Sequence, residues 1–130
     1  MIPDDLLASV VTMRPFLPSR NFEESKRFYE ALGFAVVSLG DKTAHVQLGR
    51  TGGSFSFLLQ DFYQKDFAEN LMMHLLVDDL DAWWEHIVSL NLKERFGVGE
   101  PRAPQLESWG LRVAYVFDPA GVLWHIASER

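Results

Sequence analysis

The feature that most constrains the fold is one pattern that occurs in both halves of the chain. A strand-like segment, an amphipathic helix and several further strand-like segments follow one another twice in 130 residues. A single shift of 58 residues superposes both ends of the two expected helices, Asn21 on Asp79 and Gly33 on Asn91. Because both ends agree, the sequence predicts an internal structural repeat, although few side chains are identical between the halves.

The helix boundaries follow from the residue types at each end. Asn21 caps the first helix and Asp78 or Asp79 caps the second, because short polar side chains accept hydrogen bonds from free backbone N–H groups. Gly33 and Asn91 end the helices, since both residue types tolerate positive φ. Apolar residues recur at helical spacing in both: Phe22, Phe28, Tyr29 and Leu32, then Leu80, Trp83, Ile87, Val88 and Leu90.

Extended segments make up most of the remaining chain. The expected strands are residues 10–17, 35–39, 43–49, 54–60, 72–77, 111–117 and 122–127, joined by turns at 40–42, 50–53 and 118–121. Pro15 and Pro18 restrict the first strand to a sheet edge or a short run. We expect residues 61–70 to form a partly helical linker, and residues 97–110, rich in Gly and Pro, to form a loop.

The predicted fold class is α+β, with two βαβββ modules that form a curved mixed sheet. Helices cover one face of this sheet and leave the other face concave. The chain is one domain of 130 residues, with module one at about 10–60, a linker at about 61–70 and module two at about 71–130.

Composition excludes several classes of protein. Apolar residues make up 48% and charged residues 23%, which is typical of a globular chain. Eighteen acidic against twelve basic residues give a net charge of −6, which opposes binding to nucleic acid or anionic membranes. There is no cysteine, no apolar run long enough for a membrane span, and no basic leader. We therefore expect a cytoplasmic protein; its charge suits a cationic ligand, or serves solubility alone.

Alternation along the strands separates core residues from site candidates. His45, His74 and His125 each fall on the side of their strand opposite the apolar residues. The same alternation is expected to place Phe55, Phe57, Tyr115 and Phe117 on the concave face. Because no helix covers that face, these aromatic residues need a ligand or a partner subunit to cover them.

Two residues of the expected 97–110 loop are further candidates. Trp109 either anchors the loop or stacks on a flat ring of a ligand. Glu107 is either solvated or pairs with a cationic group of a ligand. Three imidazoles from His45, His74 and His125 could hold a metal ion. Because no carboxylate is in phase with them, we favour the interpretation that they are polar side chains lining a water-filled cavity.

Three motifs resemble the vicinal oxygen chelate superfamily of glyoxalases, bleomycin-resistance proteins and extradiol dioxygenases. The Leu-Pro-Ser-Arg-Asn-Phe run at 17–22 and Phe-Tyr-Glu-Ala-Leu-Gly-Phe at 28–34 are similar to its first strand and helix. Asp-Pro-Ala-Gly at 118–121 is similar to its closing hairpin. The start at 17–20 and the Pro/Trp segment at 101–110 look most like the bleomycin-resistance proteins. The resemblance covers about residues 14–129 and implies this fold and a homodimer with crevices between subunits.

The resemblance also bears on a metal site. The metal-ligand positions of superfamily enzymes match Arg14, Phe57, Met72 and His125 in this sequence. Arg has no lone pair to offer, Phe cannot ligate, and Met is too soft for the metals of these enzymes. One competent ligand implies no metal and no cofactor. Tyr115 matches a catalytic tyrosine of extradiol dioxygenases, but without a metal it is expected to form an aromatic wall.

The predicted function is metal-free, non-enzymatic sequestration of a bulky cationic aromatic ligand, of the bleomycin-resistance type, at a crevice of a homodimer. The expected ligand-binding residues are His45, Phe57, His74, Glu107, Trp109, Tyr115, Phe117 and His125. No catalytic residue is expected. Two alternatives stay open: a glyoxalase- or dioxygenase-like metalloenzyme with an atypical His site, and a structural or regulatory dimer without a small ligand.

Overall fold

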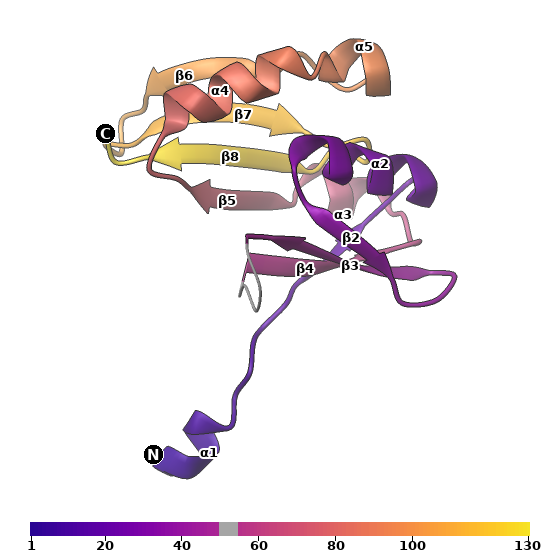
Figure 1. Ribbon diagram of the computed structural model, residues 1–130, viewed down its shortest axis with the longest axis vertical. Helices are drawn as coiled ribbons and strands as arrows, with labels where there is room; N and C mark the ends of the chain where they lie inside the picture. Colours follow the sequence, from indigo (N-terminus) through magenta and orange to yellow (C-terminus); the bar gives the residue numbers. More distant parts are fainter. Residues whose placement is uncertain (50–54) are drawn as a thin grey trace.

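A computed structural model of the chain describes residues 1–49 and 55–130 as two modules and an N-terminal arm (Figure 1). The first module contains β1 (Phe16–Pro18), α2 (Phe22–Leu32), β2 (Ala35–Ser38), β3 (Thr43–Leu48) and β4 (Phe55–Gln60). The second contains β5 (Met72–Leu76), α4 (Leu80–Ser89), α5 (Leu92–Phe96), β6 (Arg102–Leu106), β7 (Arg112–Phe117) and β8 (Leu123–Ser128). The linker carries α3 (Lys65–Glu69), as expected, and the predicted turn at 50–53 lies outside the described residues.

The helix caps are those that the sequence predicts. The Asn21 side chain accepts a hydrogen bond of 3.1 Å from the amide of Glu24, and the Asp79 side chain accepts one of 3.0 Å from the amide of Ala82. Gly33 has φ +124° and Asn91 has φ +51°. Asn91 reverses the chain, and α5, which the sequence did not predict, begins at the next residue because Leu92 is buried there.

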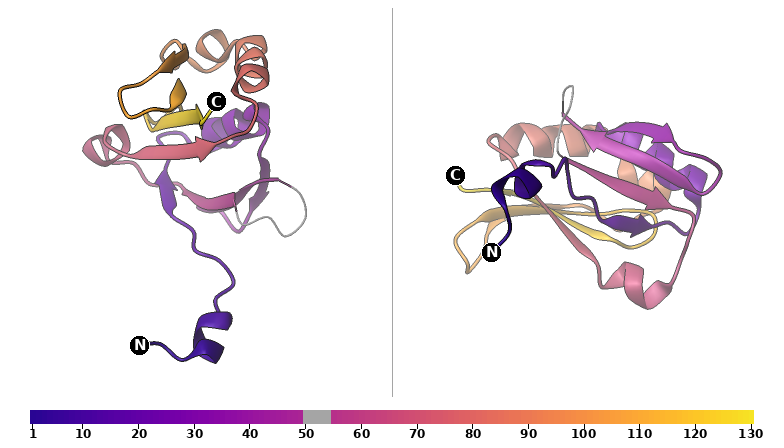
Figure 2. Two further views of the ribbon diagram at one scale, coloured as in Figure 1. Left: turned by 90° about the vertical axis from the view of Figure 1, so that its left-hand side faces the viewer. Right: turned by 90° about the horizontal axis from the view of Figure 1, so that it is seen from below.

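The sheet topology confirms the repeat. The strand orders are β1-β4-β3-β2 and β5-β8-β7-β6, so that each module has the same arrangement. In each module the first strand pairs parallel to the last, and the remaining pairs are antiparallel. The expected curved sheet is divided into two four-stranded sheets, because β1 and β5 are both edge strands and no ladder joins them among the described residues (Figure 2).

The first strand is shorter than predicted. The sequence favours a strand over residues 10–17, whereas β1 begins at Phe16 and the preceding residues belong to an arm that leaves the body of the molecule (Figure 1). Pro15 and Pro18 lack the N–H groups that a longer ladder requires. Residues 1–16 are all exposed except Thr12, which is half-buried.

The loop predicted at 97–110 contains the edge strand β6. Its ladder with β7 shifts register between Arg102 and Gln105. Pro104 lies inside the strand, and proline is tolerated at an edge because its missing N–H faces away from the partner strand. The Gly and Pro residues of this segment favoured the prediction of a loop. The internal repeat nevertheless requires a strand at this position.

The core lies between the modules and is built around four aromatic rings. Tyr29, Phe34, Phe57 and Trp124 contact one another with ring centroids 5.0 to 5.8 Å apart. The Trp124 indole donates to the Tyr29 hydroxyl at 3.0 Å, and this hydroxyl donates to Asp118 at 2.6 Å. Because Tyr29 and Trp124 come from different modules, this cluster fixes the modules together.

The closing turn between β7 and β8 is held by the carboxylate of Asp118. It accepts hydrogen bonds of 2.9 Å from the amides of Ala120 and Val122. Burial raises the pKa of Asp118 to about 6, although the hydrogen bonds from Tyr29 and the backbone oppose this increase. Among the described residues, no helix has the length and apolar character that crossing a bilayer requires.

Candidate ligand-binding site

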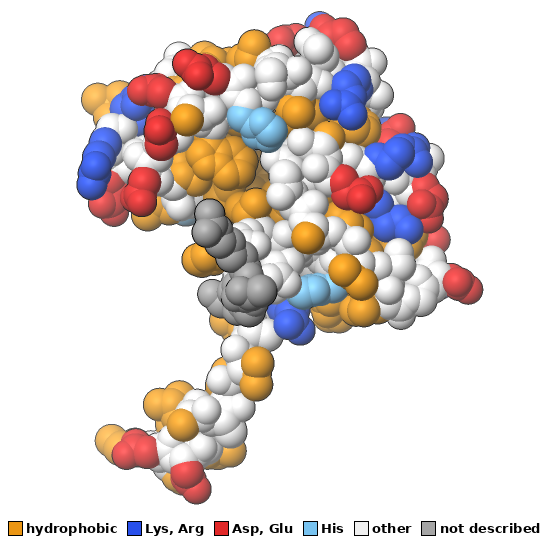
Figure 3. Space-filling model, viewed as in Figure 1, with side chains coloured by type: hydrophobic (Ala, Val, Ile, Leu, Met, Phe, Trp, Pro, Cys, Tyr) orange, Lys and Arg blue, Asp and Glu red, His pale blue; other side chains and the backbone are white. Residues whose placement is uncertain are grey.

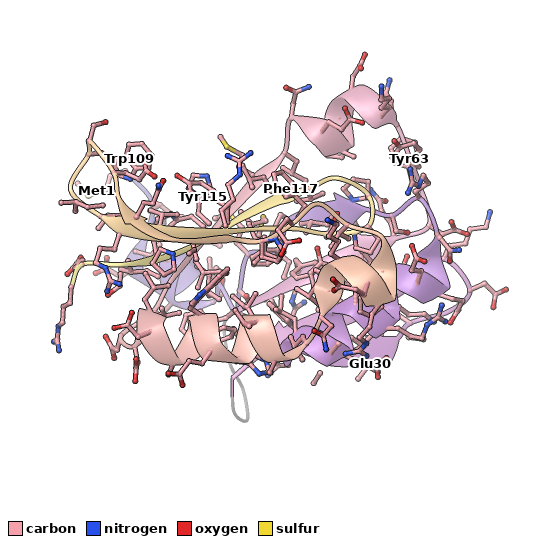
Figure 4. The ribbon with its side chains drawn as sticks, turned by 90° about the horizontal axis from the view of Figure 1, so that it is seen from above. Met1, Glu30, Tyr63, Trp109, Tyr115 and Phe117 are labelled. Atoms are coloured by element: carbon pink, nitrogen blue, oxygen red, sulfur yellow. The ribbon has the colours of Figure 1, made fainter. Side chains whose placement is uncertain are left out.

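The strongest candidate site is the outer face of the second sheet, the side turned away from α4. The register pairs Tyr115 of β7 with His125 of β8 and places His74 of β5 on the other side of His125. Phe117 lies two residues beyond Tyr115 and shares its face. Figure 4 shows Trp109, Tyr115 and Phe117 in a row along this side of the sheet.

The side chains at the centre of this face are in contact. The rings of Tyr115 and His125 meet edge to face with centroids 5.0 Å apart, and the rings of His74 and His125 are 6.2 Å apart. Burial lowers the pKa of His125, and the neighbouring His74 lowers it further, against an opposing effect of Glu107. The lowered pKa of His125 favours its neutral imidazole, which can donate one hydrogen bond and accept another.

The turn between β6 and β7 contributes the carboxylate of Glu107 and the indole of Trp109 to the same face. The amide of Glu107 bonds to the carbonyl of Leu111 at 2.9 Å, and the amide of Gly110 bonds to the carbonyl of Glu107 at 3.0 Å. Burial and a hydrogen bond with Glu107 raise the pKa of Tyr115. At the tip of the turn, the Trp109 side chain is 57% exposed, so a ligand can reach its ring.

Six of the eight predicted ligand-binding residues thus lie on one surface, which we name the outer face. Its members are His74, Glu107, Trp109, Tyr115, Phe117 and His125. Met72 and Leu76 flank His74 on the same side of β5 and are exposed. They were not among the predicted site residues, although the alternation that selected His74 also marks them.

His45 is not brought to this surface within one chain. It lies on β3 of the first sheet, between Val37 of β2 and Leu58 of β4. As predicted, it points away from the core residues Ala44 and Val46. Its Nε2 atom is buried without a hydrogen-bond partner among the described residues.

The predicted place of Phe57 on the concave face is wrong. Its side chain is 2% exposed and packs in the core against Tyr29, Phe34 and Trp124. Phe55 lies on the same side of β4; its side chain is exposed, but it belongs to the first sheet and not to the outer face of the second. Since side chains alternate along a strand, an error of one residue moves a side chain to the opposite face.

The pairing registers give the correct correspondence between modules. Leu58 lies beside Phe16 as His125 lies beside His74, and the 58-residue shift relates Phe16 to His74. The counterpart of His125 is therefore Leu58, and the counterpart of Phe57 is Trp124. Leu58 has no lone pair to donate to a metal ion. The corrected position therefore cannot bind a metal, and neither could Phe57, the position that the sequence predicted.

The residues present do not fit the metal site of the superfamily enzymes. Arg14, at the expected first ligand position, donates a hydrogen bond of 3.1 Å to the hydroxyl of Ser56. Within residues 1–49 and 55–130, no group of three or more His, Cys, Asp or Glu is placed to hold a metal ion. Among the described residues, His74 and His125 form a pair without a third ligand of this kind, and His45 lies on the other sheet.

Comparison with known proteins agrees with the fold. Residues 9–126 match the family model of the Glyoxalase/Bleomycin resistance protein/Dioxygenase superfamily. A curated relative, the bleomycin resistance protein of Klebsiella pneumoniae, is 32% identical over 115 residues, which cover 84% of this chain and 85% of that protein.

Solved structures of the same group superpose over most of the chain. A bleomycin-binding protein complexed with bleomycin has a TM-score of 0.72 at 28% identity and covers 92% of this chain and 98% of its own. A bleomycin resistance determinant encoded on transposon Tn5 has a TM-score of 0.72 at 26% identity with the same coverage. The chain therefore belongs to the Glyoxalase/Bleomycin resistance protein/Dioxygenase superfamily.

Proposed function

We propose that this chain is a binding protein of the bleomycin-resistance type, which sequesters a bulky, cationic and partly aromatic ligand without making or breaking a bond. The observation that carries the proposal is the row of aromatic and imidazole side chains on the outer face, with the carboxylate of Glu107 beside Tyr115. A surface of this composition suits flat rings and a positive charge together.

Different side chains of the outer face would contact different chemical groups of the ligand. Trp109 and Tyr115 offer ring faces and edges for stacking. His74 and His125 offer polar contacts that can donate or accept. Glu107 attracts a cationic group, and the net charge of −6 strengthens the attraction at long range.

The relatives support the same class of ligand. One structure with 28% identity is named as a bleomycin-binding protein in complex with bleomycin, and the curated relative is named as a bleomycin resistance protein. A protein that protects a cell in this way acts stoichiometrically, because each bound ligand occupies one site until it dissociates.

We propose a homodimer, in which a second copy covers the outer face. Met72 and Leu76 on that face and Phe16 beside the arm are large, apolar and exposed. The arm adds further exposed apolar side chains, Ile2, Leu6, Leu7, Val10, Val11 and Met13 (Figure 3). A second copy would convert the open face into a crevice, and its first sheet would be the element that brings His45 near the ligand.

The experiment is a calorimetric titration of the protein with metal-free bleomycin, followed by mass spectrometry of the recovered ligand. We expect saturation at one ligand per chain and a ligand of unchanged mass. Metal analysis of protein purified without chelators accompanies the titration. No binding, a chemically altered ligand, or stoichiometric metal bound through His74 and His125 would each contradict the proposal, and the last two would favour a metalloenzyme.

A further inference from the structure

A separate cavity lies at the opposite end of β7 from the Trp109 turn. Its volume is about 300 Å³. Its walls include Arg20 before α2, Tyr63 of the linker, Glu69 of α3, Val98 after α5, and Phe117 with the closing turn 118–121. Figure 4 shows Tyr63 beyond Phe117, away from Trp109. The cavity is therefore built from four segments that are distant in sequence: Arg20, the linker with α3, residues 97–99 and residues 117–121.

Two glycines keep this cavity open. A Cβ atom at Gly99 would lie 3.3 Å from the ring of Phe117, and one at Gly121 would lie 3.2 Å from the Cγ atom of Glu69. Gly121 also has φ +98°, a conformation that other residues rarely adopt. A larger residue at either position would require Phe117 or Glu69, both of which line the cavity, to shift.

The cavity presents opposite charges without an internal partner. In the described parts of the chain, neither the guanidinium of Arg20 nor the carboxylate of Glu69 forms an ion pair or a hydrogen bond. The nearby Asp118 differs, because Tyr29 and two backbone amides occupy its oxygens. A cation and an anion thus remain available at one cavity, with the ring of Phe117 and the side chain of Val98 as apolar surface.

We propose that this cavity binds a small zwitterion of the α-amino acid class with an apolar side chain. Arg20 would pair with the ligand carboxylate, since its fork of N–H donors matches two oxygens. Glu69 would pair with the ligand ammonium group, and Phe117 and Val98 would contact the side chain. A simple anion is disfavoured by Glu69 and a simple cation by Arg20.

The size of the cavity agrees with this class, because about 300 Å³ is at the lower limit of small-molecule pockets. The proposal does not depend on the bleomycin-type function, since Arg20, Tyr63 and Glu69 lie outside the outer face. Phe117 is the one side chain that belongs to both.

The test is a titration of ¹⁵N-labelled protein with three probes, observed through backbone amide shifts. L-phenylalanine carries both charges, N-acetyl-L-phenylalanine lacks the cation, and L-phenylalaninamide lacks the anion. We expect L-phenylalanine to give saturable shifts at Val98, Gly99, Ala120 and Gly121, in the millimolar range, and each single-charge probe to bind about tenfold more weakly.

Substitutions test separately how the two charges and the shape of the cavity contribute to binding of L-phenylalanine. Arg20→Gln and Glu69→Gln are each expected to weaken L-phenylalanine by about tenfold, and Gly99→Ala to weaken it through Phe117. The matched control is Arg27→Gln, which removes an exposed arginine of α2 outside the cavity and is expected to leave binding unchanged. Circular dichroism confirms that each variant is folded.

Three results would overturn the proposal. The first is the absence of saturable shifts at these amides up to the solubility limit of L-phenylalanine. The second is equal affinity for all three probes, which would indicate apolar contact alone. The third is an equal loss in Arg27→Gln and Arg20→Gln, which would indicate a general charge effect.

Discussion

At the scale of single residues, the outer face depends on a few side chains whose roles can be separated. In the proposed site, Trp109 would contribute surface, Glu107 would contribute charge, and His74 and His125 would contribute polar contacts. The strand candidates that share the outer face were selected by alternation along β5, β7 and β8. Phe57 was placed wrongly because neighbouring Phe57 and Leu58 are both apolar, so composition gives no indication of which one faces the core.

Trp109→Ala is expected to weaken binding of a bleomycin-type ligand by about tenfold or more. Ring stacking contributes about 0.5–1.5 kcal/mol beyond buried area, a tenfold change corresponds to about 1.4 kcal/mol, and the loss of buried area adds to the effect. The fold should be unchanged, since the ring is exposed on a turn. Fluorescence titration measures the affinity, and Phe62→Ala, at an exposed aromatic residue of the linker, is the control. Equal affinities of the wild type and Trp109→Ala would remove Trp109 from the site.

Glu107→Gln keeps the shape of the side chain and removes its charge. Affinity for a cationic ligand should fall several-fold, and the remaining affinity should depend less on salt concentration. The pKa of Tyr115 should move down toward its ordinary value, because the charge of Glu107 and their hydrogen bond both raise it. Ultraviolet titration of the tyrosines reports this shift. An unchanged salt dependence would show that Glu107 does not contact the ligand.

Asp118→Asn should change how stability depends on pH. The pKa of Asp118 is about 6 in the folded chain against 3.8 when unperturbed, so the folded state binds this proton more tightly. This group therefore adds stability as the pH falls through 6 toward 3.8. Between pH 8 and pH 5, the free energy of unfolding of the wild type should gain about 1 kcal/mol relative to the variant. Parallel urea-unfolding results for the two proteins would contradict the raised pKa.

At the scale of elements, the sequence is informative where local chemistry decides the structure. Caps, helical spacing and the ends at Gly33 and Asn91 predicted α2 and α4 within a residue or two, because those signals act over one or two turns. The edge strands β1 and β6 were harder, since proline is both a marker of loops and a tolerated residue at an edge. Their extents depend on pairing with β4 and β7, which lie far away in the sequence.

The two caps offer a test of the repeat. Asn21→Ala and Asp79→Ala each remove one side-chain hydrogen bond to a free backbone amide. Each substitution should lower the free energy of unfolding by about 1 kcal/mol, and the two effects should be similar because the caps occupy equivalent positions. Chemical denaturation provides the measurement. A loss confined to one helix would indicate that the modules are not equivalent in energy.

At the scale of the whole molecule, one chain leaves apolar surface on its arm and its outer face. Light scattering at micromolar concentration should give twice the mass of the chain, because obligate dimers of this kind commonly bury more than about 2,000 Å². Deletion of residues 1–11 should weaken the dimer, since it removes apolar side chains that are exposed in one copy. A monomeric full-length chain under these conditions would contradict the proposed crevice.

We propose that the outer face holds the ligand intact. A crystal structure of the protein with metal-free bleomycin tests this most directly. We expect an unmodified ligand with one ring against Trp109, a cationic group toward Glu107, and contacts to His74 and His125 beneath the first sheet of a second copy. Ligand bound elsewhere on the molecule, or a chemically altered ligand on the outer face, would contradict it.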